Sequence, residues 1–218
     1  MKTKLHFAGL NQESSARGLE GQDVLISYAD IIRRPGVWAR DILPRLEAGA
    51  YGDVILDSGA FTVISAGISI DAHEYGRFIE QYGHLFDRII NLDSIAGCIP
   101  TTHRNQRTLE GYANGQQIVP VFHQGEDWEI LEGYLADHDF ICVGFARKPG
   151  GKLVGGCQAF LDEFFARLQG RAQVHGLAMT KWAASGYDFY SVDSTTWISE
   201  KCALARRSFE GGHGAIGT

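Results

Sequence analysis

The sequence lacks several features that mark particular classes of protein. It contains no run of about 18 apolar residues, so we expect no transmembrane helix and no membrane partner. Residues 1–7 include lysines but are not followed by an apolar stretch, so we predict no signal peptide and a cytoplasmic protein. The 20 basic residues are outnumbered by 26 acidic ones. This net charge of −6 argues against a general positive coat for nucleic acid and leaves a local basic face open.

The spacings that mark metal sites are also missing. Cysteine occurs four times, and no two cysteines form a C-x-x-C pair or join histidines at metal-ligand spacing. The four residues are Cys98, Cys142, Cys157 and Cys202. Without a secretory signal we expect reduced thiols, and we predict neither a metal site nor a cofactor.

The chain does carry a regular series of apolar runs. Its 218 residues are enough for one domain with a substantial core, and its 27 glycines lie mostly beside these runs, as tight loops after strands require. The runs are nearly continuous in apolar character, which is typical of parallel strands covered on both faces. They are residues 5–8, 24–28, 54–57, 88–93, 118–123, 140–145, 174–178 and 189–193.

Amphipathic segments separate most of the runs and predict helices. They are residues 41–48, 71–85, 101–114, 127–135, 158–168 and 199–209. Eight strands alternating with helices predict an α/β fold, a compact single-domain (β/α)8 TIM barrel over residues 1–209 with a flexible glycine-rich tail at 210–218. The first and seventh connections are too short for full helices. An open doubly wound sheet is the alternative architecture.

Three aspartates follow the apolar runs directly. In a parallel barrel, functional groups come from the carboxyl ends of the strands, so Asp57, Asp93 and Asp193 are expected at one mouth. Each alone can be read as a cap of a turn or helix, which is less favoured for all three together. Two convergent carboxylates suit displacement at an anomeric carbon, with one as nucleophile and the other as acid/base. Three carboxylates also suit Mg²⁺.

Five short motifs follow one another along the chain. They are Asp57-Ser58-Gly59-Ala60-Phe61, Asn91-Leu92-Asp93-Ser94, Pro120-Val121-Phe122-His123-Gln124-Gly125, Val143-Gly144-Phe145-Ala146 and Val192-Asp193-Ser194. In order and spacing they resemble the tRNA-guanine transglycosylase superfamily, over roughly residues 24–197. The Ala60-Phe61 variant and the compact length are most similar to the phage and genomic-island relatives that insert 7-deazaguanines into DNA.

The resemblance implies roles for individual residues. Asp193 resembles the nucleophile that attacks C1′ of the target nucleoside, and Asp57 resembles the acid/base that handles the proton of the departing and incoming bases. Asp93 resembles the acceptor for the N1–H and 2-amino edge of guanine. The remaining candidates for base binding are Gln124 near O6, the Gly144–Phe145 backbone, Phe61 as a stacking neighbour, His123 and Ser58.

Two departures from the family pattern bear on the substrate. The bacterial tRNA enzymes carry a structural zinc site of three cysteines and a histidine after the last strand, and this chain has no such cluster. Ser194-Thr195-Thr196-Trp197 replaces a segment resembling P-T-R. We therefore expect DNA as the polymer, with a flipped target base and a free 7-deazaguanine as the incoming base. The alternatives are a tRNA-directed enzyme, an Mg-dependent TIM-barrel hydrolase or lyase, and a non-catalytic nucleic-acid-binding subunit.

Basic residues follow the fourth, sixth and seventh runs and are expected near the same mouth. A patch there would contact phosphates while the rest of the molecule stays acidic, although solvated loop charges are the alternative. The residues are Arg104, Arg107, Arg147, Lys148, Lys152 and Lys181. Trp182 and Trp197 are candidates for stacking on bases or for packing. His175 starts the seventh run, so we expect it at the opposite end of the barrel in a structural role.

Overall fold

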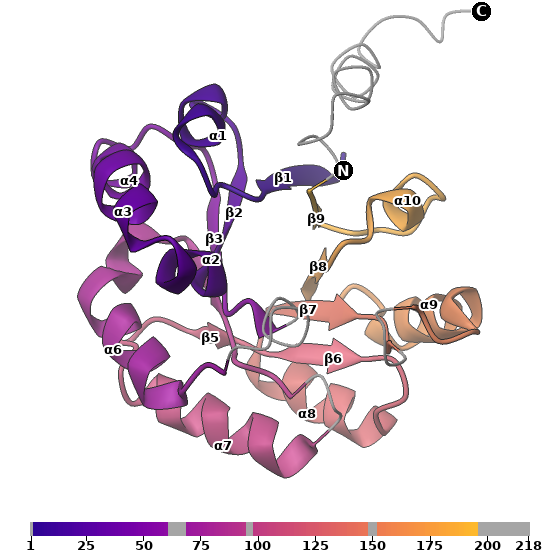
Figure 1. Ribbon diagram of the computed structural model, residues 1–218. Coiled ribbons are helices and arrows are strands. Elements are labelled where there is room, and N and C mark those ends of the chain that lie inside the picture. Colours follow the sequence, from indigo (N-terminus) through magenta and orange to yellow (C-terminus); the bar gives the residue numbers. More distant parts are fainter. Residues whose placement is uncertain (1, 61–68, 95–97, 148–151, 196–218) are drawn as a thin grey trace, which may run out of the picture.

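The computed structural model describes residues 2–60, 69–94, 98–147 and 152–195. Its strands are all parallel and lie in the order β5-β4-β3-β2-β1-β9-β8-β7-β6. The strands are β1 (Lys4–Ala8), β2 (Val24–Ser27), β3 (Val54–Asp57), β4 (Arg88–Ile90), β5 (Ile118–Val119), β6 (Val121–His123), β7 (Phe140–Gly144), β8 (Gln173–Gly176) and β9 (Ser191–Ser194). Figure 1 shows helices outside the ring that these strands form.

The helices fill the connections between strands. They are α1 (Glu13–Gly18), α2 (Tyr28–Arg33), α3 (Pro35–Val37), the π-helical turn η1 (Trp38–Ile42), α4 (Leu43–Glu47), α6 (Ala72–Tyr82), the 3₁₀ turn η2 (Gly83–Leu85), α7 (Ile99–Glu110), α8 (Trp128–Asp137), α9 (Cys157–Leu168) and α10 (Thr180–Ala183). Asp71 begins α6 by accepting hydrogen bonds from the amides of His73 and Glu74, because a carboxylate satisfies the free N–H groups of a first turn.

The two ends of the sheet meet in the segment that contains Pro120. Strands β5 and β6 are two halves of one extended segment, divided at Pro120, which has no N–H to donate to a ladder. The first half bonds to β4 and the second to β7, and the Pro120 carbonyl still accepts the amide of Cys142 at 2.9 Å. The expected (β/α)8 TIM barrel is confirmed, with the fifth strand split in two.

Both faces of the strands are buried, as the continuous apolar runs indicate. On β2, Val24 and Ile26 pack in the cluster beneath the surrounding helices, whereas Leu25 belongs to the cluster inside the barrel. On β7, Ile141 and Val143 face the helices and Cys142 faces the interior. Alternate residues of each strand therefore point at the barrel axis, and this alternation determines which side chains reach the mouth.

The second strand ends earlier than the sequence predicts. We predicted a strand through Tyr28, but β2 ends at Ser27 and α2 begins at once. Tyr28 is apolar enough to extend the run, yet it packs against Tyr75 and Phe78 of α6. The first and seventh connections hold only the short helices α1 and α10, as expected. The helix predicted at 199–209 and the tail at 210–218 lie outside the described residues.

Among the helices within the described ranges, none is both long and apolar enough to cross a membrane.

Candidate active site

A pocket of about 510 Å³ opens at the carboxyl ends of the strands. All three aspartates expected at the mouth line it: Asp57 from the end of β3, Asp93 from just after β4, and Asp193 from β9. His123, Gly144 and Phe145, at the ends of β6 and β7, line it too. The structure therefore brings the three aspartates together around one cavity, as their positions at strand ends predict.

Asp57 is the carboxyl group most altered by this environment. Burial at the mouth, together with the negative charges of Asp93 and Asp193, raises the pKa of Asp57 to about 7. One hydrogen bond, from the Gly59 amide at 3.0 Å, works in the opposite direction. Gly59 has a φ of +78°, and a side chain there would collide with Ala29 and Ser27. A glycine is therefore needed for the turn that places Asp57.

Asp93 pairs with His123 across the pocket. Asp93 Oδ2 lies 2.6 Å from His123 Nε2, and the Asp93 side chain is 7% exposed. Desolvation lowers the pKa of His123, but the hydrogen bond and charge of Asp93 outweigh it and raise this pKa above its usual value. The hydrogen bond to Asp93 therefore favours the positively charged form of the His123 imidazole. Such a pair suits a ligand with neighbouring hydrogen-bond donors and acceptors.

Asp193 lies deep in the pocket at 8% exposure. Its Oδ1 accepts a 2.6 Å hydrogen bond from the backbone amide of Ala178 and lies 3.5 Å from Nε2 of His175. Ala178 adopts a left-handed conformation with a φ of 55°, which is uncommon for a residue with a side chain. This conformation turns the amide toward the carboxylate.

Other predicted base-binding residues vary in position. The Gln124 side chain donates to the Gly155 carbonyl at 2.9 Å and does not line the pocket, so it ties down the loop after β7. Ser58 is fully buried, and its Oγ accepts from the Ala60 amide at 3.4 Å. Phe145 lines the pocket and packs edge-on against Trp182, which supports the packing interpretation of Trp182. Phe61 lies outside the described residues.

The basic residues do not form one patch. Arg147 lines the pocket, and Lys181 lies on α10 directly after the pocket-lining Thr180. Arg107 instead lines a groove between α7 and α8 on the outer surface. Arg104 and Lys152 are exposed, with Arg104 bonded to Thr101 near the start of α7. Lys148 and Trp197 lie outside the described residues.

Sequence reasoning missed two functional candidates. Asp30 lines the pocket from α2, and its position three residues after the end of β2 is the signal that could have identified it. His175 was wrongly expected at the far end of the barrel. It is fully buried, lies on β8 opposite Ser191 in register, and is the imidazole nearest to Asp193.

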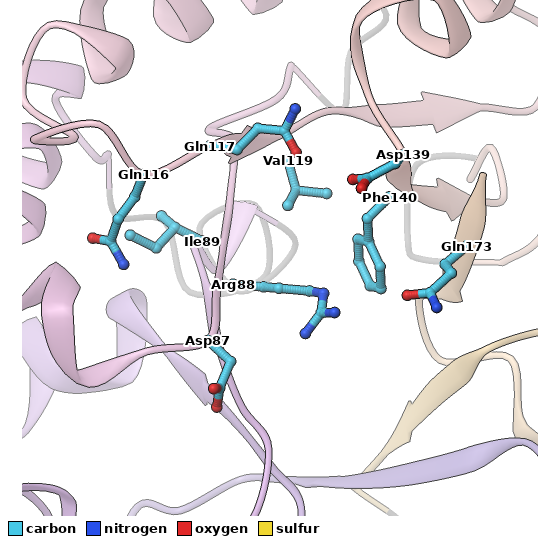
Figure 2. A pocket seen from close by; sticks show the side chains of 9 residues that line it. All are labelled: Asp87, Arg88, Ile89, Gln116, Gln117, Val119, Asp139, Phe140 and Gln173. Atoms are coloured by element: carbon cyan, nitrogen blue, oxygen red, sulfur yellow. The ribbon is translucent and has the colours of Figure 1, made fainter.

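The opposite end of the barrel has a second, smaller hollow of about 290 Å³. Figure 2 shows Arg88 extending into it toward Phe140. The guanidinium carbon lies 4.3 Å from the centre of that ring, and Nη1 lies 3.3 Å from Asp53. Asp87 at the rim accepts the Val54 amide. Arg88 and Asp87 therefore each have a partner within the barrel floor.

In the described part of the chain, no set of three or more histidine, cysteine, aspartate or glutamate side chains is arranged to hold a metal ion.

Comparison with known proteins supports the fold alone. No family model and no curated protein matches the chain. A Streptococcus mutans protein described as KGPDC superposes with a TM-score of 0.55 at 13% identity, covering 97% of each chain. The carboxyl transferase domain of Rhizobium etli pyruvate carboxylase gives a TM-score of 0.52 at 13% identity, over 88% of this chain and 40% of that one. Both are similar to this chain in their barrel architecture.

Proposed function

We propose that this protein is a DNA-guanine transglycosylase, a glycosyltransferase that exchanges guanine in DNA for a free 7-deazaguanine base. The observation that carries the proposal is the pocket in which Asp57, with a pKa of about 7, faces Asp93 and Asp193. Asp57 can hold or release a proton near neutral pH, and two further carboxyl groups line the same pocket. Such a set suits base exchange at an anomeric carbon, which needs an acid/base and a nucleophile.

In the first displacement, a lone pair of the ionised Asp193 carboxylate forms a bond to C1′ of the target nucleoside. The C1′–N9 bond breaks, and its electron pair leaves with guanine, which takes the proton of neutral Asp57. A covalent ester between Asp193 and the sugar results. A poor leaving group is thus displaced by an intramolecular nucleophile with a proton donor in place.

In the second displacement the proton returns. Ionised Asp57 removes the N9 proton of the incoming 7-deazaguanine, whose nitrogen attacks C1′ and releases the Asp193 carboxylate. The two inversions give retention at C1′. Asp57 must be neutral in one half and ionised in the other, so a pKa of about 7 suits both at neutral pH.

The Asp93–His123 pair supplies a reader for the base. The carboxylate of Asp93 accepts from the N1–H and 2-amino donors of a guanine-like edge, and the charged imidazole of His123 is a donor for the neighbouring O6. A base lacking either partner would leave a buried polar group unpaired, which costs about 1–3 kcal/mol.

A base-exchange assay tests the proposal. The protein is incubated with radiolabelled guanine and, separately, single-stranded DNA, duplex DNA or bulk tRNA, with and without a chelator, beside Asp193→Ala. We expect label in DNA, none in tRNA, no effect of the chelator and no label with the variant. Label in tRNA would favour the tRNA-directed alternative. Chelator-sensitive hydrolysis without exchange would favour the Mg-dependent alternative, and binding without turnover would favour the non-catalytic subunit.

A further inference from the structure

The two polar contacts of Asp193 among the described residues both reach the same oxygen. The Ala178 amide donates to Oδ1 at 2.6 Å, and His175 Nε2 lies 3.5 Å from that same Oδ1. This leaves Oδ2 as the oxygen available for a new bond. The Asp193 carboxylate is therefore held at Oδ1. The groups that hold Oδ1 determine how Oδ2 is oriented toward the sugar.

The tautomer of His175 follows from its second nitrogen. Nδ1 lies 2.8 Å from the hydroxyl oxygen of Ser191, its partner in register on β9. If Nδ1 carried the proton, the Nε2 lone pair would face the Asp193 carboxylate, which is repulsive. If Ser191 donates to Nδ1, the Nε2–H points at Oδ1, which is attractive. The second arrangement directs the Nε2–H at Asp193 as an electrostatic attraction over 3.5 Å, since Nε2 makes no hydrogen bond of ordinary geometry within the described residues.

The environment keeps His175 neutral. Its side chain is fully buried, and desolvation lowers its pKa despite the opposing effect of Asp193. His6, from β1, meets its ring edge-on at a centroid distance of 5.5 Å, and Asp53 lies beyond His6 at 3.6 Å. A neutral imidazole with a fixed tautomer directs its Nε2–H at the Asp193 carboxylate and adds no positive charge to the pocket.

We propose that His175 is a positioning residue for Asp193, with the Ser191 hydroxyl fixing its tautomer. The proposal rests on the proposed function, in which Asp193 is the nucleophile. His175 and the Ala178 amide hold Oδ1, so that Oδ2 forms the ester bond to C1′. When that ester breaks, the same two donors stabilise the returning carboxylate.

Steady-state kinetics on four variants test this role. His175→Leu removes the donor, His175→Gln restores an N–H donor, and Ser191→Ala releases the tautomer. Leu131→Ala is the control for loss of packing alone, because Leu131 is fully buried on α8 and does not line the pocket. A displacement of about 1 Å at a reacting group can cost 100-fold in rate. We expect kcat to fall at least about tenfold in His175→Leu with KM unchanged, to fall less in Ser191→Ala and to recover partly in His175→Gln.

The control separates positioning from packing. Leu131→Ala should lower the unfolding midpoint, as large-to-small changes in a core do, and leave kcat within about twofold of the unsubstituted protein. Equal losses of kcat in both variants, or an unchanged kcat in His175→Leu, would overturn the proposal. If His175→Leu does not fold, Ser191→Ala decides, since it removes a single oxygen.

A readout without activity separates this proposal from the proposed function. The amide proton of Ala178 reports the bond to Asp193, because a short bond to a carboxylate shifts the proton strongly in NMR spectra. This shift should change in His175→Leu and Ser191→Ala and stay the same in Leu131→Ala. If the protein exchanges no base but the shift behaves this way, positioning stands and the proposed function fails. An unchanged shift in His175→Leu contradicts positioning.

Discussion

Asp57 is stable as a neutral acid because its burial and the neighbouring charges of Asp93 and Asp193 disfavour the ionised form. An unfolded chain would ionise this residue near its ordinary pKa of 3.8, whereas the folded protein holds the proton up to a pKa of about 7. The folded state therefore binds more protons between these values, so its stability falls as pH rises from about 4 to 7. Three pKa units correspond to as much as about 4 kcal/mol. The site thus costs the fold stability at neutral pH.

Asp57→Asn should remove this cost. The amide keeps an oxygen for the Gly59 N–H and has no charge to bury. We expect the variant to have a larger free energy of unfolding than the parent at pH 8, by a few kcal/mol, and nearly the same value at pH 4. Base exchange should be lost. Urea denaturation at both pH values measures the difference, with Asp127→Asn, at an exposed position, as the control. A variant no more stable at pH 8 would show that Asp57 is not held neutral.

Helices α6 and α7 approach closely at a glycine. A Cβ on Gly76, which is buried in α6, would fall on the ring of Tyr112 just after α7, and that ring is held by a 3.1 Å contact between its hydroxyl and His73. Gly133 in α8 has open space around the same position. These two glycines in helices therefore serve different purposes, one for close packing and one with no steric requirement.

Alanine substitution should separate the two glycines. Gly76→Ala should destabilise the protein by about 1–3 kcal/mol through overpacking. Gly133→Ala should stabilise it by up to about 1 kcal/mol, since alanine is the better helix former. Chemical denaturation of both variants measures this. Equal effects would contradict the close approach of α6 to Tyr112.

The positions of the strands could be predicted from the sequence, whereas the depth of a side chain along the barrel axis could not. Strand runs and their terminal aspartates were found because burial on both faces leaves an unmistakable apolar pattern, which ends where polar groups are needed. The depth of His175 was not found, because it depends on the offset between β8 and β9. That register pairs His175 with Ser191, two residues before Asp193. The sequence of one strand does not give its register with the next strand. The approach of His175 to Asp193 could therefore not be predicted.

The net charge of the whole molecule opposes the binding of nucleic acid. At −6 the protein should repel a polyanion at long range, so the proposed contact with DNA needs local cations. Arg147 lines the pocket, whereas Arg107 lies in the outer groove between α7 and α8. These arginines have the same charge and differ in position, which makes them a matched pair.

Arg147→Gln should weaken DNA binding and reduce the slope of log K against log salt by about one, as expected for the loss of one phosphate contact. Arg107→Gln should change neither quantity. Fluorescence anisotropy with a labelled oligonucleotide, measured over a range of salt concentrations, gives both. Equal losses in the two variants would place the DNA on a different face.

A covalent bond between Asp193 and C1′ is the central claim of the proposed function, and it can be trapped. The protein is mixed with a guanine-containing oligonucleotide in the absence of free base, denatured, and examined by gel electrophoresis and by mass spectrometry of its peptides. We expect a DNA adduct on the peptide that contains Asp193, absent in Asp193→Asn and discharged when free guanine is added before denaturation. An adduct on any other residue, or label exchange with no adduct at Asp193, would contradict it.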